Sequence, residues 1–275
     1  MKRLFAFGCS YTKYFYPTWA DILISNYEHG WNCGHIGSSN QLISNRIWET
    51  FTKTDLTDQD VIIINWTNYF REDRYHTESG WHTPGNIFNN LTQRGFTLNN
   101  FSYKSDIDWA DLKHYVYRDC NIITSTLEGL ANTDATVIST CINNPYTDKL
   151  LLEQDKLKGL LQNYKKWLTP QVKTISEHCY YPEVEKDKTR LQYNNNGTWI
   201  IEDHPLPKEH LSYATEVLAP ELGINISQAT NDSENYIHKN IGFNYRFTSL
   251  NAAFGISQIK KIKNILKKKR EIYNF

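Results

Sequence analysis

The sequence contains only five cysteines in 275 residues, and they are widely spaced. No two of them form a C-x-x-C pair, and no histidine cluster stands at metal-ligand spacing. A disulfide scaffold needs a dense, even set of cysteines, and a structural zinc site needs closely spaced Cys and His. We therefore expect no disulfide framework and no bound metal, and we expect a reducing, cytoplasmic compartment.

Long apolar runs are also missing. No stretch approaches the roughly 20 apolar residues that are needed to cross a bilayer. The N-terminal sequence MKRLFAFGCSYT has an apolar run of only four residues before Gly8. This run is too short for a signal peptide, and it predicts a strand.

The whole chain has no excess of charge of one sign. Lys plus Arg and Asp plus Glu number 30 each, so we expect no electrostatic binding of nucleic acid by the whole protein. The last 46 residues nevertheless hold nine Lys or Arg against three Asp or Glu. A content of 40% hydrophobic and 22% charged residues is typical of a globular protein, here one large domain or a domain with an appendage.

Short apolar runs alternate with helical patterns along the chain, and this alternation favours an α/β fold with a mostly parallel sheet. Nearly unbroken apolar runs are typical of strands that are buried on both faces. They predict strands at residues 4–7, 61–64 and 137–141. The helical patterns predict helices at residues 18–26, 108–130 and 149–168, the last ending before Thr169-Pro170.

Two other segments have a distinct composition. Residues 72–105 are polar and aromatic and directly follow a predicted strand, which predicts a long loop, either functional or a plain surface insertion. The sequence NNNG at residues 194–197 is typical of the turn of a hairpin, between residues 191–193 and 198–201.

A serine follows the first predicted strand at once, in the run FAFGCSYT. Open α/β sheets bind ligands at the carboxyl ends of their strands, and N–H groups at a helix start can stabilise an oxyanion. A hydroxyl nucleophile also needs a base, and the loop EDHPLP places His204 beside two carboxylates. We predict that Ser10 is a nucleophile and His204 its general base; the alternative is a plain turn serine and a surface histidine.

Four blocks in this order, FAFGCSYT, GHIGSSNQLISNR, VIIINWTNYFRED and EDHPLPKEHLSYATEVLAP, resemble the GDSL/SGNH hydrolases. The first block is similar to the FGCS(F/Y)T variants of that family in bacteriophage and marine viral proteins. The resemblance covers about residues 1–222. It implies a flavodoxin-like three-layer α/β/α sandwich that hydrolyses acyl esters, often of carbohydrates or lipids, without a metal or organic cofactor.

The resemblance also implies the oxyanion donors. They are the N–H of Ser10 itself, Gly37 and Asn68. The block around Asn68 lacks the Gly and Asp that flank this Asn in the family, and Cys9 stands where the family usually has Asp.

The acid that orients His204 remains open between two residues. Glu202 has the two-residue spacing of the family, and Asp203 directly precedes the histidine. Either carboxylate suits a triad if the geometry accommodates it.

Three residues are candidate substrate contacts. Asn40 follows the Gly37 block, and it is interpreted either as a substrate contact or as the cap of a helix that begins near Gln41. Arg71 stands at the end of the third strand, where it suits an anionic or sugar substrate. Trp81 belongs to the aromatic loop, whose rings offer a stacking surface for a sugar.

From Glu234 onward the sequence resembles the DegT-type pyridoxal-phosphate sugar aminotransferases. The pattern H-x-x-x-G-x-N-x-R-x-(T/S)-x-L-x-A-A-x-G is matched by His238, Gly242, Asn244, Arg246, Thr248, Leu250, Ala252, Ala253 and Gly255. The resemblance implies that Asn244 and Arg246 are the counterparts of residues that face the cofactor phosphate of a neighbouring subunit. The family's Schiff-base lysine and the acid facing the pyridine nitrogen lie in segments that are not found in this sequence.

We therefore expect residues 1–222 to form the hydrolase-like domain and residues 223–275 to be an aminotransferase-like extension without cofactor. Residues 252–272 predict a basic amphipathic helix that docks on the domain or pairs with a second copy. The leading hypothesis is an SGNH-type esterase or deacetylase. The alternatives are an inactive binding or structural phage protein and a part of a sugar aminotransferase.

Overall fold

The computed structural model describes residues 2–78, 80–86, 109–152, 155–179, 191–193, 199–201 and 204–226. The chain divides into two units, residues 1–234 and residues 235–275. All described residues belong to the first unit. The C-terminal helix predicted at residues 252–272 lies outside the described residues, as do Asn244 and Arg246.

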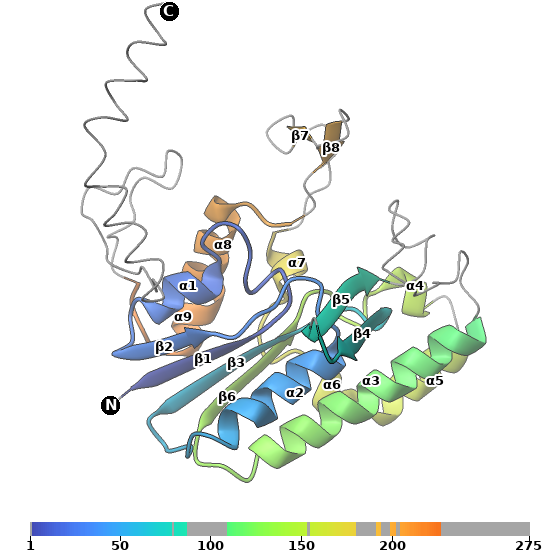
Figure 1. Cartoon of the computed structure of the whole chain (residues 1–275), viewed down its shortest axis with the longest axis horizontal. Helices are drawn as coiled ribbons and strands as arrows, with labels where there is room; N and C mark the ends of the chain where they lie inside the picture. The colour runs from blue at the N-terminus through green and yellow to red at the C-terminus, as the bar shows by residue number, and fades with distance from the viewer. Residues whose placement is uncertain are drawn as a thin grey trace, which may run out of the picture. The chain divides into compact units, whose positions relative to one another are not determined.

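Four parallel strands form the central sheet, in the order β2-β1-β3-β6 (Figure 1). Their bounds are β1 Arg3–Gly8, β2 His29–Asn32, β3 Asp60–Trp66 and β6 Thr136–Cys141. Gly8 of β1 lies opposite Asn65 of β3, which in turn lies opposite Thr140 of β6. The carboxyl ends of these three strands therefore meet at one edge of the sheet.

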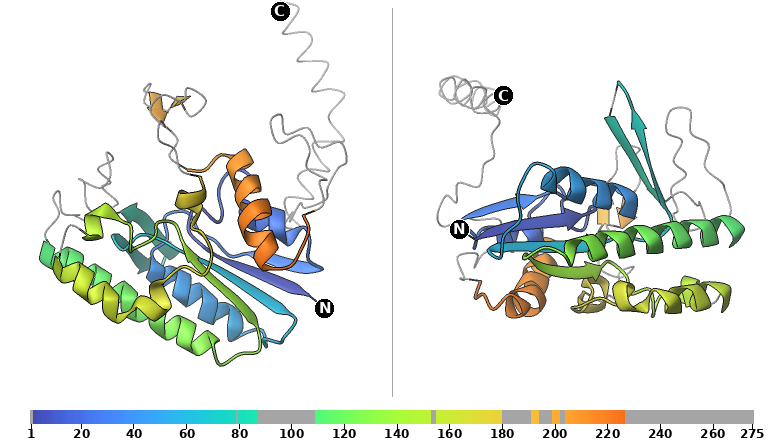
Figure 2. Two further views of the ribbon diagram at one scale, coloured as in Figure 1. Left: turned by 180° about the vertical axis from the view of Figure 1, so that it is seen from behind. Right: turned by 90° about the horizontal axis from the view of Figure 1, so that it is seen from below.

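Alternate strand residues bury against two different sets of helices. Phe5, Phe7, Ile62 and Ile64 pack against α2 (Asn40–Phe51), α3 (Trp109–Leu130), α4 (Lys149–Leu152), α5 (Asp155–Asn163) and α6 (Lys165–Leu168). Leu4, Ala6, Ile63 and Ile138 pack against α1 (Trp19–Ile24), α7 (Ile175–His178), α8 (Pro207–Tyr213), the π-helical η4 (Ala214–Leu218) and α9 (Ala219–Glu221). The right-hand view of Figure 2 shows α2, in blue, and α8, in orange, on opposite sides of the sheet. The predicted α/β/α sandwich with a parallel sheet is confirmed.

The predicted single helix over residues 149–168 is wrong. The chain instead forms α4, α5 and α6, and residues 153–154 lie outside the described residues. A break falls at Tyr164, whose φ of −107° and ψ of 8° depart from helical values. The Tyr164 hydroxyl donates to Asn121 Oδ1 of α3 at 2.8 Å, so a side-chain contact accompanies the break.

The segment predicted as a long loop from residue 72 begins instead as a hairpin. Strand β4 (Arg71–His76) pairs antiparallel with β5 (Gly80–Asn86), and the register shifts between Glu72 and Arg74. The hairpin projects from the body of the domain in the right-hand view of Figure 2. Residues 87–108 lie outside the described residues. The second predicted hairpin is confirmed in its strands, because β7 (Leu191–Tyr193) pairs antiparallel with β8 (Trp199–Ile201).

The helical segment that begins with α8 changes its hydrogen-bond spacing along its length. After α8, the chain forms η4, and the Ala219 N–H donates to the carbonyl of Ala214, five residues earlier. Pro220 follows and has no N–H to donate. The π-helical segment, with its wider hydrogen-bond spacing, therefore joins α8 to α9 next to Pro220, which cannot donate an α-helical hydrogen bond.

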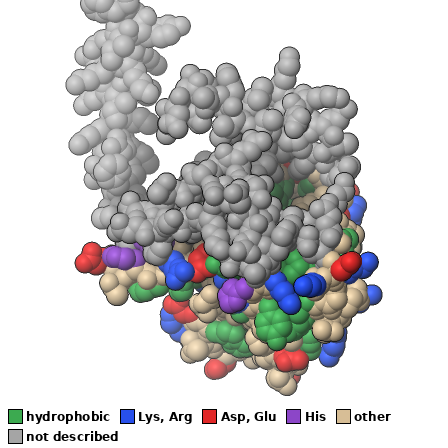
Figure 3. Space-filling view, turned by 90° about the vertical axis from the view of Figure 1, so that its right-hand side faces the viewer, with side chains coloured by type: hydrophobic (Ala, Val, Ile, Leu, Met, Phe, Trp, Pro, Cys, Tyr) green, Lys and Arg blue, Asp and Glu red, His purple; other side chains and the backbone are tan. Residues whose placement is uncertain are grey.

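In the described part of the chain, no helix is both long enough and apolar enough to cross a membrane. On the face shown in Figure 3, positively and negatively charged side chains of the described residues are interspersed. This mixture matches the equal totals of acidic and basic residues in the whole sequence.

Candidate active site

Ser10 lies at the turn that leaves the carboxyl end of β1. The carbonyl of Cys9 accepts hydrogen bonds from the N–H groups of Thr12 at 2.9 Å and Lys13 at 3.1 Å, so the chain turns tightly around the serine. A β-carbon at Gly8 would overlap the Thr12 hydroxyl and lie 2.9 Å from the carbonyl oxygen of Asn65. Only glycine fits before this turn, which explains the Gly-x-Ser sequence in physical terms.

The Ser10 hydroxyl lies 2.8 Å from Nε2 of His204. The two residues are 194 positions apart in the sequence. They are the residues that the sequence analysis predicted to act together. Ser10 is 4% exposed and His204 is partly buried. A serine oxygen this close to an imidazole nitrogen has the geometry in which the imidazole can accept the hydroxyl proton.

The strand order places this pair where an open α/β sheet binds its ligands. From β1 the chain goes to β2 on one side and then to β3 on the other. The crevice at the carboxyl ends of the strands where the order reverses is the ligand-binding point of such folds. Ser10 follows β1 and Asn68 follows β3, so both stand at this point.

Aromatic residues that follow Ser10 contact the ring of His204. The Tyr14 ring stacks on the His204 ring, with centroids 4.3 Å apart and planes 20° apart, and the Tyr11 ring lies at 5.1 Å. The Tyr16 hydroxyl donates to the carbonyl oxygen of Pro205 at 2.8 Å. The segment that carries Ser10 therefore also holds the loop that carries His204. Sequence reasoning missed these contacts, although the aromatic run directly after Ser10 was a visible signal.

The two candidate acids, Glu202 and Asp203, lie outside the described residues. The choice between them therefore stays a prediction. The loop after His204 is fixed from its other side, where the Leu206 N–H donates to Glu209 Oε2 at 2.5 Å.

Gly37 lies in a loop that is tied to the end of β1. The carbonyl of Gly8 accepts from the His35 N–H at 3.0 Å and from the Ser38 hydroxyl at 3.3 Å. Gly37 has a φ of 78°, and a β-carbon there would overlap the carbonyl oxygen of Thr83 in β5. Across the described ranges, the N–H groups of Ser10 and Gly37 donate to no protein acceptor. Both are thus available to hold a negatively charged oxygen.

Asn68 follows β3 with its amide oriented by a neighbour. Its Oδ1 accepts from Asn143 Nδ2 at 3.1 Å, which leaves the amide nitrogen of Asn68 on the other side of the group. Asn68 also lines a cleft of about 420 Å³, including its open mouth, at the carboxyl ends of β3 and β6. The cleft is lined by Trp66, Thr67, Asn68, Tyr69, Phe70, Ile123, Ser139, Thr140, Cys141, Asn143, Asp148, Leu168 and Pro170, a set that does not include Ser10 or His204.

Asn40 occupies an interior position. It is 0% exposed, and its amide is engaged by the Thr67 backbone and by Asp119. Its polar atoms therefore face protein groups, which corrects the interpretation of Asn40 as a substrate contact. The cap interpretation also changes, because α2 begins at Asn40 and its N-cap is Ser39, whose hydroxyl accepts from the Gln41 N–H at 3.2 Å.

The other two proposed substrate contacts lie on the β4–β5 hairpin. Arg71 is 8% exposed, and its Nη1 donates to the carbonyl of Ser38 at 3.2 Å, so it holds the Gly37 loop. Trp81 is partly buried and packs edge-on against Tyr75, with ring centroids 5.3 Å apart. The hairpin reaches the site through Thr83, whose hydroxyl donates to the carbonyl of Ile36 at 2.8 Å.

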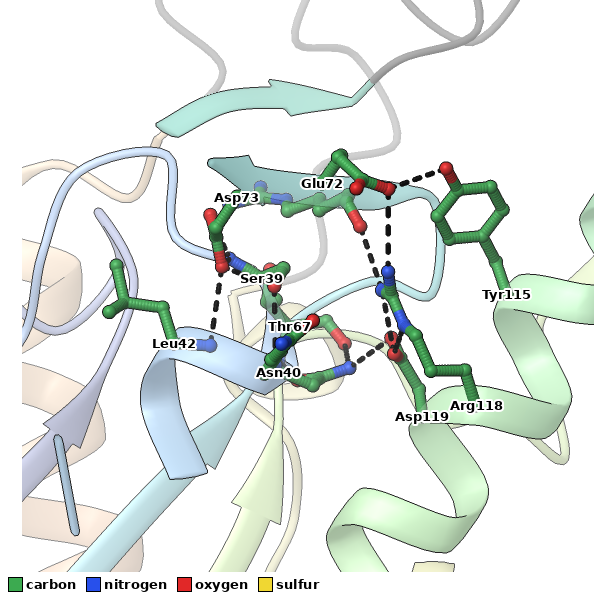
Figure 4. Close-up of polar contacts among 11 residues, drawn as sticks. Ser39, Asn40, Leu42, Thr67, Glu72, Asp73, Tyr115, Arg118 and Asp119 are labelled. Atoms are coloured by element: carbon green, nitrogen blue, oxygen red, sulfur yellow. Dashed lines mark hydrogen bonds and ion pairs between the residues drawn. The ribbon is translucent and has the colours of Figure 1, made fainter. Parts of the chain in front are cut away.

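Two buried carboxylates next to the start of α2 were not anticipated from the sequence (Figure 4). Asp73 accepts from the N–H groups of Ser39 and Leu42 at the start of α2, and burial raises its pKa. Asp119 on α3 is 0% exposed, and burial raises its pKa to about 6. An aspartate on the apolar face of a helix, next to Cys120 and one turn from Val116 and Ile123, was the signal that could have identified it.

No group of three or more His, Cys, Asp and Glu side chains within the described ranges is arranged to hold a metal ion. The chemistry that this part of the chain offers is that of a hydroxyl, an imidazole and hydrogen-bond donors.

Comparisons with known proteins give likenesses for both parts of the chain. Residues 222–275 match the model of the DegT/DnrJ/EryC1/StrS aminotransferase family. A crystal structure described as a member of the lipolytic protein G-D-S-L family from Veillonella parvula DSM 2008 is similar at 17% sequence identity and a TM-score of 0.40, over 78% of this chain and 94% of that chain. None of the curated proteins compared matches the sequence. Both resemblances stated from the sequence thus recur in these comparisons.

Proposed function

We propose that the protein is a serine hydrolase that cleaves acyl esters, as an esterase or deacetylase of SGNH type. The observation that carries the proposal is the 2.8 Å separation between Ser10 Oγ and His204 Nε2 at the strand-order reversal of the sheet. A hydroxyl alone is a weak nucleophile, and an imidazole in hydrogen-bond reach is the group that activates it.

The chemistry proceeds in two balanced halves. The Ser10 oxygen bonds to the acyl carbon while its proton passes to His204 Nε2, and the carbonyl electrons move onto the oxygen. The ester C–O bond then breaks, and the leaving alcohol takes the proton from His204. A water molecule repeats these steps on the acyl-serine and releases the carboxylic acid.

The N–H groups of Ser10 and Gly37 support the anionic intermediate, because hydrogen-bond donors fixed in place stabilise charge that develops in the transition state. The amide nitrogen of Asn68 is the third proposed donor, supported by the hydrogen bond that holds its Oδ1 on Asn143. Glu202 or Asp203 would orient the imidazole of His204.

We favour acylated carbohydrates as the substrate class. Phe15 is 85% exposed, and its ring lies 4.8 Å from that of Tyr14, which stacks on His204. Tyr75, which is 64% exposed, and Trp81 add a second aromatic surface on the hairpin that reaches the Gly37 loop. Sugar rings stack on such faces.

The test is turnover of p-nitrophenyl acetate and butyrate by the wild-type protein and three variants. Ser10→Ala and His204→Gln are expected to lose at least about 10³-fold in kcat, the scale of removing a triad member. Cys9→Ala is the matched control, because Cys9 is the neighbouring thiol, and its activity should stay near wild type. Equal rates for wild type and Ser10→Ala would remove Ser10 from the reaction, and loss only in Cys9→Ala would point to the thiol.

A fluorophosphonate probe separates this function from the alternative of an inactive binding protein. The imperfect third block around Asn68 is compatible with that alternative. Covalent labelling of wild type but not of Ser10→Ala supports the hydrolase. An unlabelled, folded wild-type protein would favour the binding role.

We derive no step through pyridoxal phosphate. The residues that resemble its phosphate contacts, Asn244 and Arg246, lie outside the described residues. The blocks that would carry the Schiff-base lysine and the acid facing the pyridine nitrogen are not recognisable in the sequence.

A further inference from the structure

One buried amide joins the two loops that carry the proposed oxyanion donors. The Oδ1 of Asn40 accepts from the Thr67 N–H at 2.8 Å, and its Nδ2 donates to the Thr67 carbonyl at 3.0 Å. The side chain therefore pairs with both backbone groups of one residue, as a neighbouring strand would. Gly37 stands three residues before Asn40, and Asn68 directly follows Thr67.

The hydrogen bonds of the sheet do not fix the distance between the Gly37 loop and the Asn68 loop. The β3–β6 pairing continues as far as the Ile142 N–H, which donates to the carbonyl of Trp66 at 2.8 Å. Thr67 and Asn68 lie beyond this bond, and Gly37 lies between β2 and α2. The amide of Asn40 supplies a lateral contact at the first residue after β3.

Asp119 fixes which way the Asn40 amide faces. The Nδ2 of Asn40 donates to Asp119 Oδ2 at 2.9 Å, and Arg118 Nε donates to Asp119 Oδ1 at 2.8 Å. Figure 4 shows these groups converging between α2, α3 and the start of β4. Because one end of the amide faces an N–H and the other faces a carboxylate, a reversed amide would lose its hydrogen bonds at both ends.

The loop after Gly37 is held at each successive residue. The Ser38 carbonyl accepts from Arg71, and the Ser39 N–H donates to Asp73 Oδ2 at 3.0 Å. Arg118 Nη2 donates to the Arg71 carbonyl at 2.8 Å. The Gly37 loop and the Asn68 loop are thus connected to the same frame of buried side chains.

We infer that Asn40, oriented by Asp119, is a positioning residue that sets the separation between the Gly37 N–H and the Asn68 amide. The inference rests on the proposed hydrolase function. Oxyanion donors act when they lie about 2.7 to 3.1 Å from the charged oxygen, so a shift of about 1 Å between the two loops affects the transition state more than the bound ester. Asn40 acts through the two loops and does not touch the substrate.

The test compares Asn40→Ala with Ser44→Ala. Ser44 lies one turn further along α2 and is also buried, and its hydroxyl lies 2.7 Å from the Thr126 hydroxyl of α3. It therefore makes the same kind of α2–α3 contact without touching either loop. Asn40→Ala is expected to lower kcat for p-nitrophenyl acetate about 10- to 100-fold with KM within about threefold, and Ser44→Ala should keep kcat within about twofold.

A second variant, Asn40→Asp, keeps the side-chain volume and removes both amide donor bonds. It places a carboxylate oxygen against the Thr67 carbonyl and Asp119, and it is expected to lower kcat at least as far as Asn40→Ala. Melting temperatures show which variants are folded at the assay temperature. A destabilised variant is assayed at a lower temperature, at which it is folded. Wild-type kcat in either folded Asn40 variant, or an equal loss of kcat in Ser44→Ala, overturns the positioning role. Absence of Ser10-dependent turnover in the wild type overturns the hydrolase function itself and the inference with it.

Discussion

The imidazole of His204 lies stacked beneath the ring of Tyr14, with the ring centroids 4.3 Å apart. Tyr14 follows the proposed nucleophile Ser10 by four residues, while His204 lies in the loop before α8. The contact therefore ties the proposed base to the segment that carries the proposed nucleophile. It restricts rotation of the imidazole whichever acid orients the other nitrogen in the proposed triad.

We predict that Tyr14→Leu lowers kcat about 10-fold, because the imidazole gains freedom to leave the geometry in which Nε2 faces the serine. Tyr14→Phe is the matched control, since it keeps the stacked ring and removes only the hydroxyl. It should stay within about threefold of wild type. Steady-state kinetics on p-nitrophenyl esters measure both, with KM expected to change little. An equal loss in the two variants would show that the hydroxyl, and not the stack, matters.

Tyr16 makes a separate contact with the same loop, through its hydrogen bond to the carbonyl of Pro205. We predict that Tyr16→Phe lowers the free energy of unfolding by about 1 kcal/mol, the usual net contribution of one hydrogen bond. It should also slow the labelling of Ser10 by a fluorophosphonate, because the loop that carries His204 loses one attachment. Urea unfolding and the labelling rate check the two effects, and an unchanged labelling rate would limit Tyr16 to a role in stability.

Gly37 is predicted to tolerate no side chain. A β-carbon there meets two costs, the positive φ and the overlap with the Thr83 carbonyl. Gly37→Ala should therefore displace the loop and lower kcat at least about 100-fold, the scale of losing an oxyanion donor. Gly85→Ala is the control, because Gly85 has a φ of 80° and no atom within 4 Å of its β-carbon position. It isolates the cost of the positive φ, and a comparable loss of kcat there would contradict the overlap argument.

Much of the sheet could be predicted because its strands are apolar runs. Strands β1 and β3 bury both faces, so their sequences are nearly continuous in apolar residues, whereas β6 also carries the buried polar residues Ser139 and Thr140. Strand β2 has the sequence HGWN and no fully buried residue, which leaves no such signal. The β4–β5 hairpin begins with REDRYH, whose charged residues are typical of a loop. These elements form because the register and the surrounding contacts favour them, and local composition does not show that.

Some residues of the candidate site could likewise be predicted from local sequence patterns, and others could not. Ser10 and His204 could be predicted because a turn serine after a strand and a histidine among carboxylates each leave a local pattern. Asn40 and Asp119 could not be paired, since they come from different helices and form one buried contact. Contacts between distant residues are set by packing, which a single sequence does not display.

Asp119 is predicted to make stability depend on pH in mildly acidic solution. Burial raises its pKa from 3.8 to about 6, so between these values the folded protein binds a proton that the unfolded chain has released. The contribution of this group therefore favours folding at low pH and is lost as the pH rises through about 6. The wild-type free energy of unfolding, measured relative to Asp119→Asn, should fall by about 1 to 3 kcal/mol between pH 4 and pH 7. Urea titrations at several pH values measure the difference, and a flat difference would contradict the buried charge.

His210 is predicted to have the opposite effect on the pH dependence of stability. It is 0% exposed on α8, neither ring nitrogen has a hydrogen-bond partner among the described residues, and burial lowers its pKa from 6.5 to about 3. The unfolded chain therefore binds a proton below pH 6.5 that the folded protein excludes, and stability falls as the pH falls from 6.5 toward 3. At pH 5 this amounts to about 2 kcal/mol, at about 1.4 kcal/mol for each pH unit.

The variant His210→Leu has nearly the same volume and no ring nitrogens to leave without partners, so it should be at least as stable as wild type at pH 7.5. Its advantage should grow by about 2 kcal/mol at pH 5, because the leucine cannot bind a proton in the unfolded chain. Melting temperatures and urea unfolding at the two pH values measure this change. The exposed His114 on α3 provides the control, and His114→Leu should show no such growth. If the two histidine variants gained equally at pH 5, the effect would belong to the loss of any histidine and not to the burial of His210.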